Sequence, residues 1–76
     1  MDKNMWINIK PKEIIYDLID GHEEIAKLKM RQLINQKYGF VIMSNKTGIP
    51  PKSLIRMLSD KGNPTSRNLF KILRNL

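Results

Sequence analysis

The chain has 76 residues, the size of one small domain, and its 41% apolar residues suffice for a folded core. It has no cysteine, which excludes a disulfide framework, an iron–sulfur cluster and cysteine-ligated zinc sites. No stretch approaches the ~18 apolar residues of a membrane span, and the first residues lack the apolar core of a secretory signal, so we expect a cytoplasmic protein without membrane contact.

The charge of the chain is strongly basic and unevenly distributed. Fourteen Lys and Arg residues against seven Asp and Glu residues give a formal net charge of +7. Residues 1–24 hold six of the seven acidic residues, whereas residues 25–76 hold eleven basic residues and a single acidic one, Asp60. A charge run can be only a solvated face, but a basic body of this kind is typical of proteins that bind polyanions, and we favour nucleic acid as the partner.

Residues 1–10 are expected to form an arm, ahead of a single helical domain from 11 to 76. In the arm, Trp6, Ile7 and Ile9 fit either an extended segment or a packing of Trp6 on the body. Pro11 suits the first turn of a helix, and the apolar residues that follow recur with helical spacing, which predicts a helix from about 11 to 19. These apolar residues are Ile14, Ile15, Leu18 and Ile19.

A second helix is predicted from about 21 to 38. Asp20 is the expected N-cap, because Glu23 stands three residues later, as a capping box requires. The apolar face of this helix is formed by Ile25, Ala26, Met30, Leu33 and Ile34. Its solvent side is expected to carry Lys27, Lys29, Arg31 and Lys37.

Three shorter helices complete the predicted all-α, five-helix domain. The apolar run Phe40–Met43 could be a strand by itself, but it continues into a helix from about 40 to 47. Pro51 is tolerated at a helix start and opens a helix from about 51 to 58. After a loop at 59–64, Thr65 or Ser66 caps the last helix, whose apolar positions are Leu69, Phe70, Ile72, Leu73 and Leu76.

The two helices at about 40–58, joined by Gly48-Ile49-Pro50, are interpreted as a helix-turn-helix. This motif needs a small residue where the helices cross, which Ser44 supplies, and a turn residue that tolerates positive φ, which Gly48 supplies. Ile49 then provides an apolar plug. The second helix must bury one side, here Leu54, Met57 and Leu58, and offer the other to base edges.

Two segments carry a resemblance to a known family. Thr47-Gly48-Ile49 followed by a helix, and then Asp60-Lys61-Gly62-Asn63-Pro64-Thr65, resemble the helix-turn-helix of the lambda-repressor-like (Cro, XRE) superfamily. The run from Leu54 to Thr65, LIRMLSDKGNPT, is most similar to the Hig-type antidote (antitoxin) proteins of addiction modules. The resemblance covers about residues 37–76 and is weak over 1–36.

The resemblance implies a lambda-repressor-like five-helix domain and a cytoplasmic, nucleoid-associated homodimer. Members bind a palindromic operator in double-stranded DNA and repress transcription of their own operon. Many also neutralise a toxin protein that cleaves translated messenger RNA. We therefore expect a sequence-specific DNA-binding repressor that acts as the antitoxin of a toxin–antitoxin pair.

Two departures from the superfamily pattern favour an alternative function. Phe40, Val41 and Ile42 stand where the superfamily often has a glutamine that binds phosphate, and Pro50–Pro51 stands where a serine and a polar base-contacting residue are more common. The alternative is a protein-interaction module, a toxin neutraliser or adaptor that no longer reads DNA sequence. A third reading, a small RNA-binding protein, rests on charge alone and lacks the aromatic platforms of single-strand recognition.

The candidate site residues fall into two groups. Arg56 is the first candidate for a bidentate contact to guanine, and the base-contacting group as a whole is Pro51, Lys52, Ser53, Ile55 and Arg56. Within it, Ser53 has a capping role and Ile55 a core role as the simpler readings. The candidate phosphate contacts flank the second helix and are Lys46, Ser59, Lys61, Asn63, Ser66 and Arg67. Turn formation is an equally good reading for Asn63.

Catalysis and metal binding are not indicated. His22 is the only histidine, and with the adjacent Glu23 and Glu24 it cannot place three ligands on one face of a helix. There is no cysteine, and no histidine lies near a serine in a nucleophile–base arrangement. We expect neither an enzyme nor a bound cofactor or metal.

Overall fold

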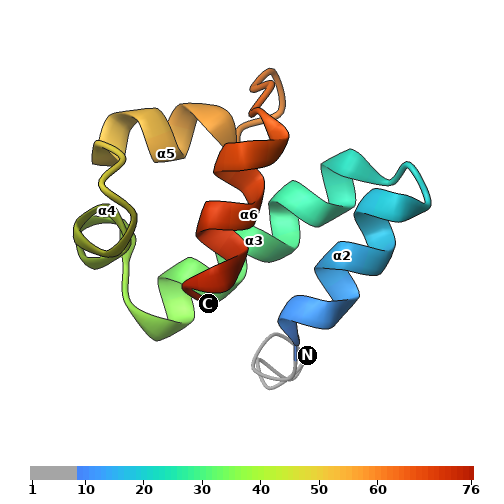
Figure 1. Ribbon diagram of the computed structural model, residues 1–76, viewed down its shortest axis with the longest axis horizontal. Helices are drawn as coiled ribbons and strands as arrows, with labels where there is room; N and C mark the ends of the chain where they lie inside the picture. Colours follow the sequence, from blue (N-terminus) through green and yellow to red (C-terminus); the bar gives the residue numbers. More distant parts are fainter. Residues whose placement is uncertain (1–8) are drawn as a thin grey trace, which may run out of the picture.

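The computed structural model describes residues 9–76, which form five helices and, within this range, no strand (Figure 1). The predicted all-α, five-helix class is therefore confirmed. Residues 1–8, and with them Trp6 and Ile7 of the predicted arm, lie outside the described residues. The helices are α2 (Pro11–Ile19), α3 (Glu23–Lys37), α4 (Phe40–Thr47), α5 (Pro51–Met57) and α6 (Ser66–Arg74). No helix in residues 9–76 is long and apolar enough to cross a membrane.

The junction between α2 and α3 differs from the predicted capping box. Asp20 is the C-cap of α2, not the N-cap of α3, which begins at Glu23 after His22 and has no side-chain cap. The chain instead closes α2 with paired backbone bonds. The N–H of Gly21 donates to Leu18 O at 3.2 Å and that of His22 to Asp17 O at 2.8 Å, as in a Schellman motif. The prediction was wrong because the same residues also suit a helix stop.

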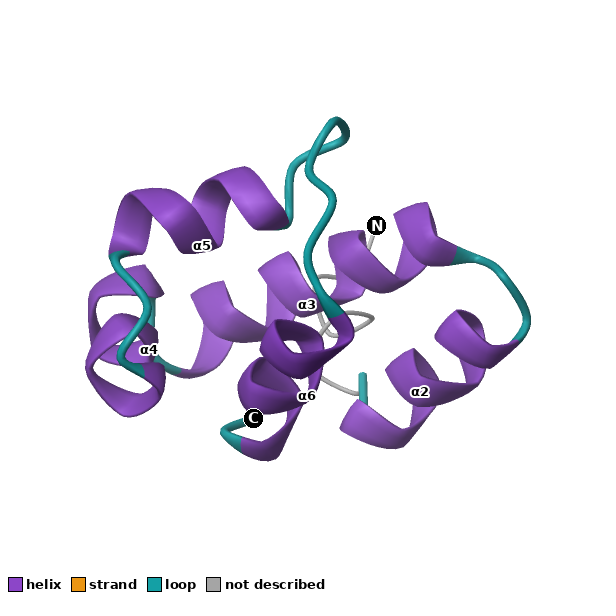
Figure 2. Cartoon of the chain, turned by 45° about the horizontal axis from the view of Figure 1, so that its top comes forward, coloured by secondary structure: helices purple, strands orange, loops and turns teal. Residues whose placement is uncertain are grey.

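Helix α3 is the central element of the fold, and α2 and α4 both pack against it (Figure 2). Its buried apolar residues are Ala26, Met30, Leu33 and Ile34, as predicted, but Ile25 is 48% exposed. At ~3.6 residues per turn Ile25 lies well outside the arc of these four residues, whereas Lys27 lies at its edge beside Ile34. Ile25 was therefore wrongly assigned to the core face, and Lys27, which is buried, to the solvent side.

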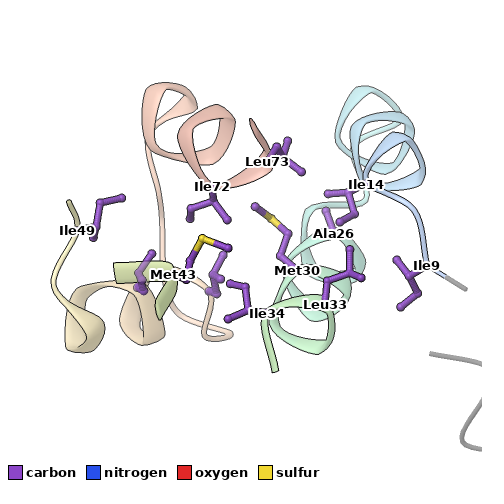
Figure 3. Close-up of a cluster of buried hydrophobic side chains, with 12 residues drawn as sticks. Ile9, Ile14, Ala26, Met30, Leu33, Ile34, Met43, Ile49, Ile72 and Leu73 are labelled. Atoms are coloured by element: carbon purple, nitrogen blue, oxygen red, sulfur yellow. The ribbon is translucent and has the colours of Figure 1, made fainter. Parts of the chain in front are cut away.

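One continuous core joins the five helices (Figure 3). Met30 lies in its middle, between α6 and the rest of α3, and every helix contributes at least one buried side chain. Burial of an aliphatic side chain of this size contributes about 1.5–3 kcal/mol. Ile9, assigned to the arm, also belongs to this core. The buried set is Ile9, Ile14, Ala26, Met30, Leu33, Ile34, Met43, Ile49, Leu54, Leu58, Ile72 and Leu73.

Ion pairs fasten α2 to α3. Lys29 Nζ lies 2.8 Å from Asp17 Oδ2 and 3.2 Å from Glu13 Oε2, so Lys29 spans the two helices and is not a free solvent-side residue. The hydrogen bond that Lys29 donates to the Asp17 carboxylate raises the pKa of Lys29 above its ordinary value of 10.5; desolvation partly opposes this shift and Glu13 adds to it. Since the pair is partly exposed, it stabilises the fold modestly.

The pH dependence of the unfolding free energy of a Lys29→Met variant tests these ion pairs. The folded-state pKa is raised, so the stabilisation is present below pH 10.5 and is lost as the pH rises through the folded pKa. We expect Lys29→Met to lower the unfolding free energy by about 0.5–1 kcal/mol at neutral pH, with the deficit shrinking in alkaline solution, as measured by urea unfolding. Lys12→Met, at an exposed position on α2, is the control. A deficit that does not change with pH would contradict the ion-pair account.

Candidate nucleic-acid interface

Helices α4 and α5 are joined by a three-residue turn that begins at Gly48. Gly48 has φ 78° and ψ 7°, a left-handed conformation that glycine adopts without steric cost, and its N–H donates to Ser44 O at 2.7 Å. Helix α4 is seen nearly along its axis in Figure 1, whereas α5 lies across the view, so the axes of the two helices are steeply inclined to each other. The two short helices and the glycine turn between them are therefore present at the positions that the sequence analysis expected.

The buried side chain of Thr47 stabilises this turn through two hydrogen bonds. Its hydroxyl donates to Met43 O at 2.9 Å and accepts a bond from the N–H of Ile49 at 3.2 Å. Both Thr47 and Ile49 are only 8% exposed, so the Thr47 hydroxyl forms both bonds away from solvent and Ile49 is the buried apolar residue of the turn. The direction in which α5 leaves the turn is therefore fixed by buried contacts.

Helix α5 buries one side and exposes the other. Leu54 and Leu58 have no exposed surface, whereas Lys52, Ile55 and Arg56 are exposed at spacings that put them on one face. Ile55 is 51% exposed, so it is not a core residue. The other two candidates for base contact, Pro51 in the first turn and Ser53, are half-buried. Both views place α5 at the edge of the molecule (Figure 1 and Figure 2).

The candidate phosphate contacts do not share one environment. Lys46, Lys61 and Arg67 are exposed, and the Nζ of Lys46 lies 4.6 Å from the centroid of the Tyr38 ring. Ser59 is half-buried, and its hydroxyl donates to Arg56 O at 2.7 Å, which closes the end of α5. The remaining two, Asn63 and Ser66, are exposed but line shallow depressions that they share with Glu23.

A buried lysine from α3 holds the end of α5 and the loop that follows it. Lys27 is 4% exposed, and its Nζ donates to Ser59 O at 2.9 Å, Asp60 O at 3.2 Å and Gly62 O at 3.0 Å. These three carbonyls use all three donors of the ammonium group. Its charge is also balanced by Glu24 Oε2 at 3.1 Å. The sequence analysis missed this role, because no local pattern around Lys27 indicates acceptors more than thirty residues away.

Arg31, one turn further along α3, adds a second cationic contact at the same place. Its guanidinium donates to Leu58 O, the carbonyl of the C-cap residue of α5. Positive charge is favourable at the C-terminal end of a helix, where carbonyl groups lack partners. Arg31 was also expected to lie on the solvent side, but it is half-buried, so two basic residues of α3 contact the end of α5 and the loop after it.

Gly62 is required by a close approach in the same loop. A Cβ atom at this position would collide with the backbone carbonyl oxygens of Arg56 and Met57 in the last turn of α5. The N–H of Gly62 also donates to Ser59 O at 3.0 Å. The loop at 59–62 is therefore folded tightly against α5, and the carbonyls that bind Lys27 are held in place from both sides.

The charges of the described residues separate into two regions. The acidic side chains of α2 and the start of α3 include Glu13, Asp17 and Glu24, each paired with a lysine of α3. From α4 onwards the only acidic residue is Asp60. Lys52, Arg56, Lys61 and Arg67 form no ion pair with another described residue, so the positive charge of α5 and of the segment that follows it is not compensated by carboxylates.

No family model, curated protein or solved structure matches the chain. The function is therefore inferred from the exposed residues of α5 and from the basic residues that follow them in the chain. Within residues 9–76, no three His, Asp or Glu side chains gather where they could hold a metal ion. The available chemistry is that of donors, namely an ammonium, a guanidinium and hydroxyl groups, beside one aliphatic side chain.

Replacement of Lys27 with methionine should be strongly destabilising. The variant keeps the apolar stem but removes the ammonium donor from three carbonyls of the loop, of which only Ser59 O keeps another donor, the N–H of Gly62. We expect the unfolding free energy to fall by about 2–4 kcal/mol in urea unfolding. Lys61→Met removes a lysine from the same loop, but an exposed one, and should change stability by less than about 0.5 kcal/mol. Equal effects of the two substitutions would contradict the role assigned to Lys27.

Alanine at Gly62 should destabilise the loop by a different route. The added methyl group meets backbone atoms that cannot turn aside, so the loop must move away from α5, at an expected cost of about 1–3 kcal/mol in the unfolding free energy. Ser66→Ala, at an exposed position at the start of α6, is the control and should cost less than about 0.5 kcal/mol. A Gly62→Ala variant as stable as this control would show that the loop is not tightly folded against α5.

Proposed function

We propose that the protein is a sequence-specific DNA-binding repressor that places α5 in the major groove. The observation that carries the proposal is the outer face of α5, which exposes Lys52, Ile55 and Arg56 while Leu54 and Leu58 are fully buried. A major groove about 12 Å wide admits one α-helix, and a helix fixed by its inner side can present three side chains to the base edges.

The proposed contacts follow from the chemistry of each side chain. Arg56 has the planar donor pair that fits guanine O6 and N7, and Lys52 reaches a base edge or a flanking phosphate from the first turn of α5. Lys46, Lys61 and Arg67 are the better candidates for phosphate contacts. Asn63 and Ser66 are weaker ones, since the Glu23 carboxylate beside them repels phosphate.

A homodimer on a palindromic operator is part of this proposal. One α5 reads only a few base pairs, and a second copy related by a two-fold axis doubles the site. Support comes from Ile19, which is 73% exposed, and Phe70, which is 51% exposed, on the two sides of a groove between α2 and α6. Burial of these apolar residues against another copy would stabilise a dimer.

The antitoxin role rests on the family resemblance of residues 37–76. In this role the protein would be cytoplasmic and nucleoid-associated, would repress its own operon and would neutralise a toxin protein. Such a partner would bind away from α5. The acidic residues at the α2–α3 junction, Asp20, Glu23 and Glu24, are exposed there and suit a basic partner.

A specific observation favours the second candidate, a protein-interaction module that does not read DNA sequence. Val41 is 67% and Ile42 is 47% exposed in the first turn of α4, where a DNA-binding motif gains from polar groups that bind phosphate. Exposed neighbouring aliphatic residues are typical of a protein interface. The two candidates differ in one measurable property, which is whether the affinity for duplex DNA depends on its sequence.

Selection from a random duplex pool at two salt concentrations tests the proposal. We expect the wild-type protein to enrich a palindrome, and Arg56→Ala to lose about 1–3 kcal/mol of discrimination at one base pair of each half-site. Arg74→Ala is the matched control, because it removes the same charge from the exposed end of α6 and should leave the base preference unchanged. Weak binding that enriches no sequence and falls steeply with salt would mean attraction to the backbone only, and would favour the interaction module.

A further inference from the structure

Ile55 is the one aliphatic side chain on a face of α5 that is otherwise polar. It is 51% exposed and stands between Lys52, three residues earlier, and Arg56, the next residue. We propose that Ile55 reads the C5-methyl group of a thymine that neighbours the guanine bound by Arg56. This inference rests on the proposed function and names the chemical group through which the site distinguishes its operator.

The chemistry of the major groove limits what Ile55 can recognise. Its side chain has no donor or acceptor, so it gains nothing from the amino, keto and ring-nitrogen groups of the base edges. The thymine methyl is the one apolar group that the four bases present in that groove. Contact with this methyl removes apolar surface from water on both partners, which is the interaction an isoleucine can offer.

The neighbouring position of Arg56 sets where the thymine lies. Consecutive residues of a helix advance by about 1.5 Å along its axis, less than the spacing of about 3.4 Å between base pairs. Side chains of Ile55 and Arg56 on the same exposed face therefore reach the same or adjacent base pairs. Since one pair cannot offer both a guanine and a thymine methyl, the operator half-site contains a thymine and a guanine at adjacent positions.

The side chain of Ile55 is well suited to a contact that depends on position. A β-branched residue in a helix has one strongly preferred χ1 rotamer, so the Cγ1 and Cγ2 atoms of Ile55 have a defined position relative to the backbone. The backbone is in turn fixed by Thr47 at the start of the unit and by Lys27 at the end of α5. A loss of contact cannot readily be repaired by a change of rotamer.

The charge around Ile55 favours DNA over a protein as the occupant of this face. Lys52 and Arg56 flank it, and Asp60 is the only acidic residue from α4 to the end of the chain. An apolar protein surface laid on Ile55 would have to desolvate both cations without pairing them. The edge of a duplex supplies phosphates and guanine acceptors to the cations and a methyl group to Ile55 at the same time.

Deoxyuridine scanning of the selected operator tests the inference. Deoxyuridine pairs as thymidine does and lacks only the C5-methyl group, so each thymine is replaced in turn and the dissociation constant is measured. We expect one thymine per half-site, next to the guanine whose preference Arg56→Ala removes, to show an approximately fourfold loss of affinity, the equivalent of ~0.8 kcal/mol for one buried methyl-sized group. The other thymines should show a smaller change.

A double-mutant cycle assigns that loss to Ile55. Ile55→Ala should bind the thymine and deoxyuridine operators with equal affinity, since the partner of the methyl is gone. Ile25→Ala is the matched control, because Ile25 is the same residue type and 48% exposed on α3, and it should keep the fourfold difference. Circular dichroism confirms that both variants fold.

The selection, the deoxyuridine scan and the double-mutant cycle together distinguish a failure of the proposed function from a failure of the methyl contact. If selection enriches no operator, the proposed function is wrong and a protein is the better occupant of the α5 face. If an operator is found but no deoxyuridine replacement weakens binding, the methyl contact is wrong and the repressor remains. If Ile55→Ala retains the thymine preference, another side chain reads the methyl, which also overturns the inference.

Discussion

The arrangement of this small protein depends on one ammonium group, that of Lys27, placed among three backbone carbonyls of a distant loop. A charge that is 4% exposed is unfavourable unless its donors are all used, so the loop must adopt one shape to receive it. That shape brings Gly62 against the last turn of α5, and Arg31 completes the contact at Leu58. The outer face of α5 is consequently held in place by two side chains of the central helix α3.

The core and the polar contacts have different tasks in this fold. A cluster of twelve buried residues draws the five helices together, but apolar contact alone tolerates small shifts of one helix against another. The orientation of α5 is specified by directional bonds at its two ends: those of Thr47 in the turn before it, and those of Arg31 at the C-cap and Lys27 in the loop that follows. A side chain that recognises a base needs this precision, since misplacement by about 1 Å is enough to weaken a designed site.

The sequence was sufficient to predict the helices, because the apolar spacing and the prolines at positions 11 and 51, which open two of them, are local signals. It also identified the exposed face of α5, where burial of Leu54 and Leu58 settles which residues point outward. The prediction was wrong at Asp20, because an aspartate between two helices can stand at the end of the first as well as at the start of the second. It failed again at Lys27, since a lysine is buried only when acceptors are available, and these belong to a loop that the fold alone brings near.

Lys27 binds main-chain oxygens of the loop and none of its side chains. Every residue type presents the same carbonyl, so the anchor makes no demand on the chemistry of positions 59–61. Asp60 and Lys61, whose side chains are exposed, can therefore be replaced without loss of this anchor, whereas Gly62 cannot. The backbone conformation of the loop thus depends on main-chain contacts and on Gly62, and not on the exposed side chains that it carries. New side chains can be introduced at those exposed positions without a redesign of the fold.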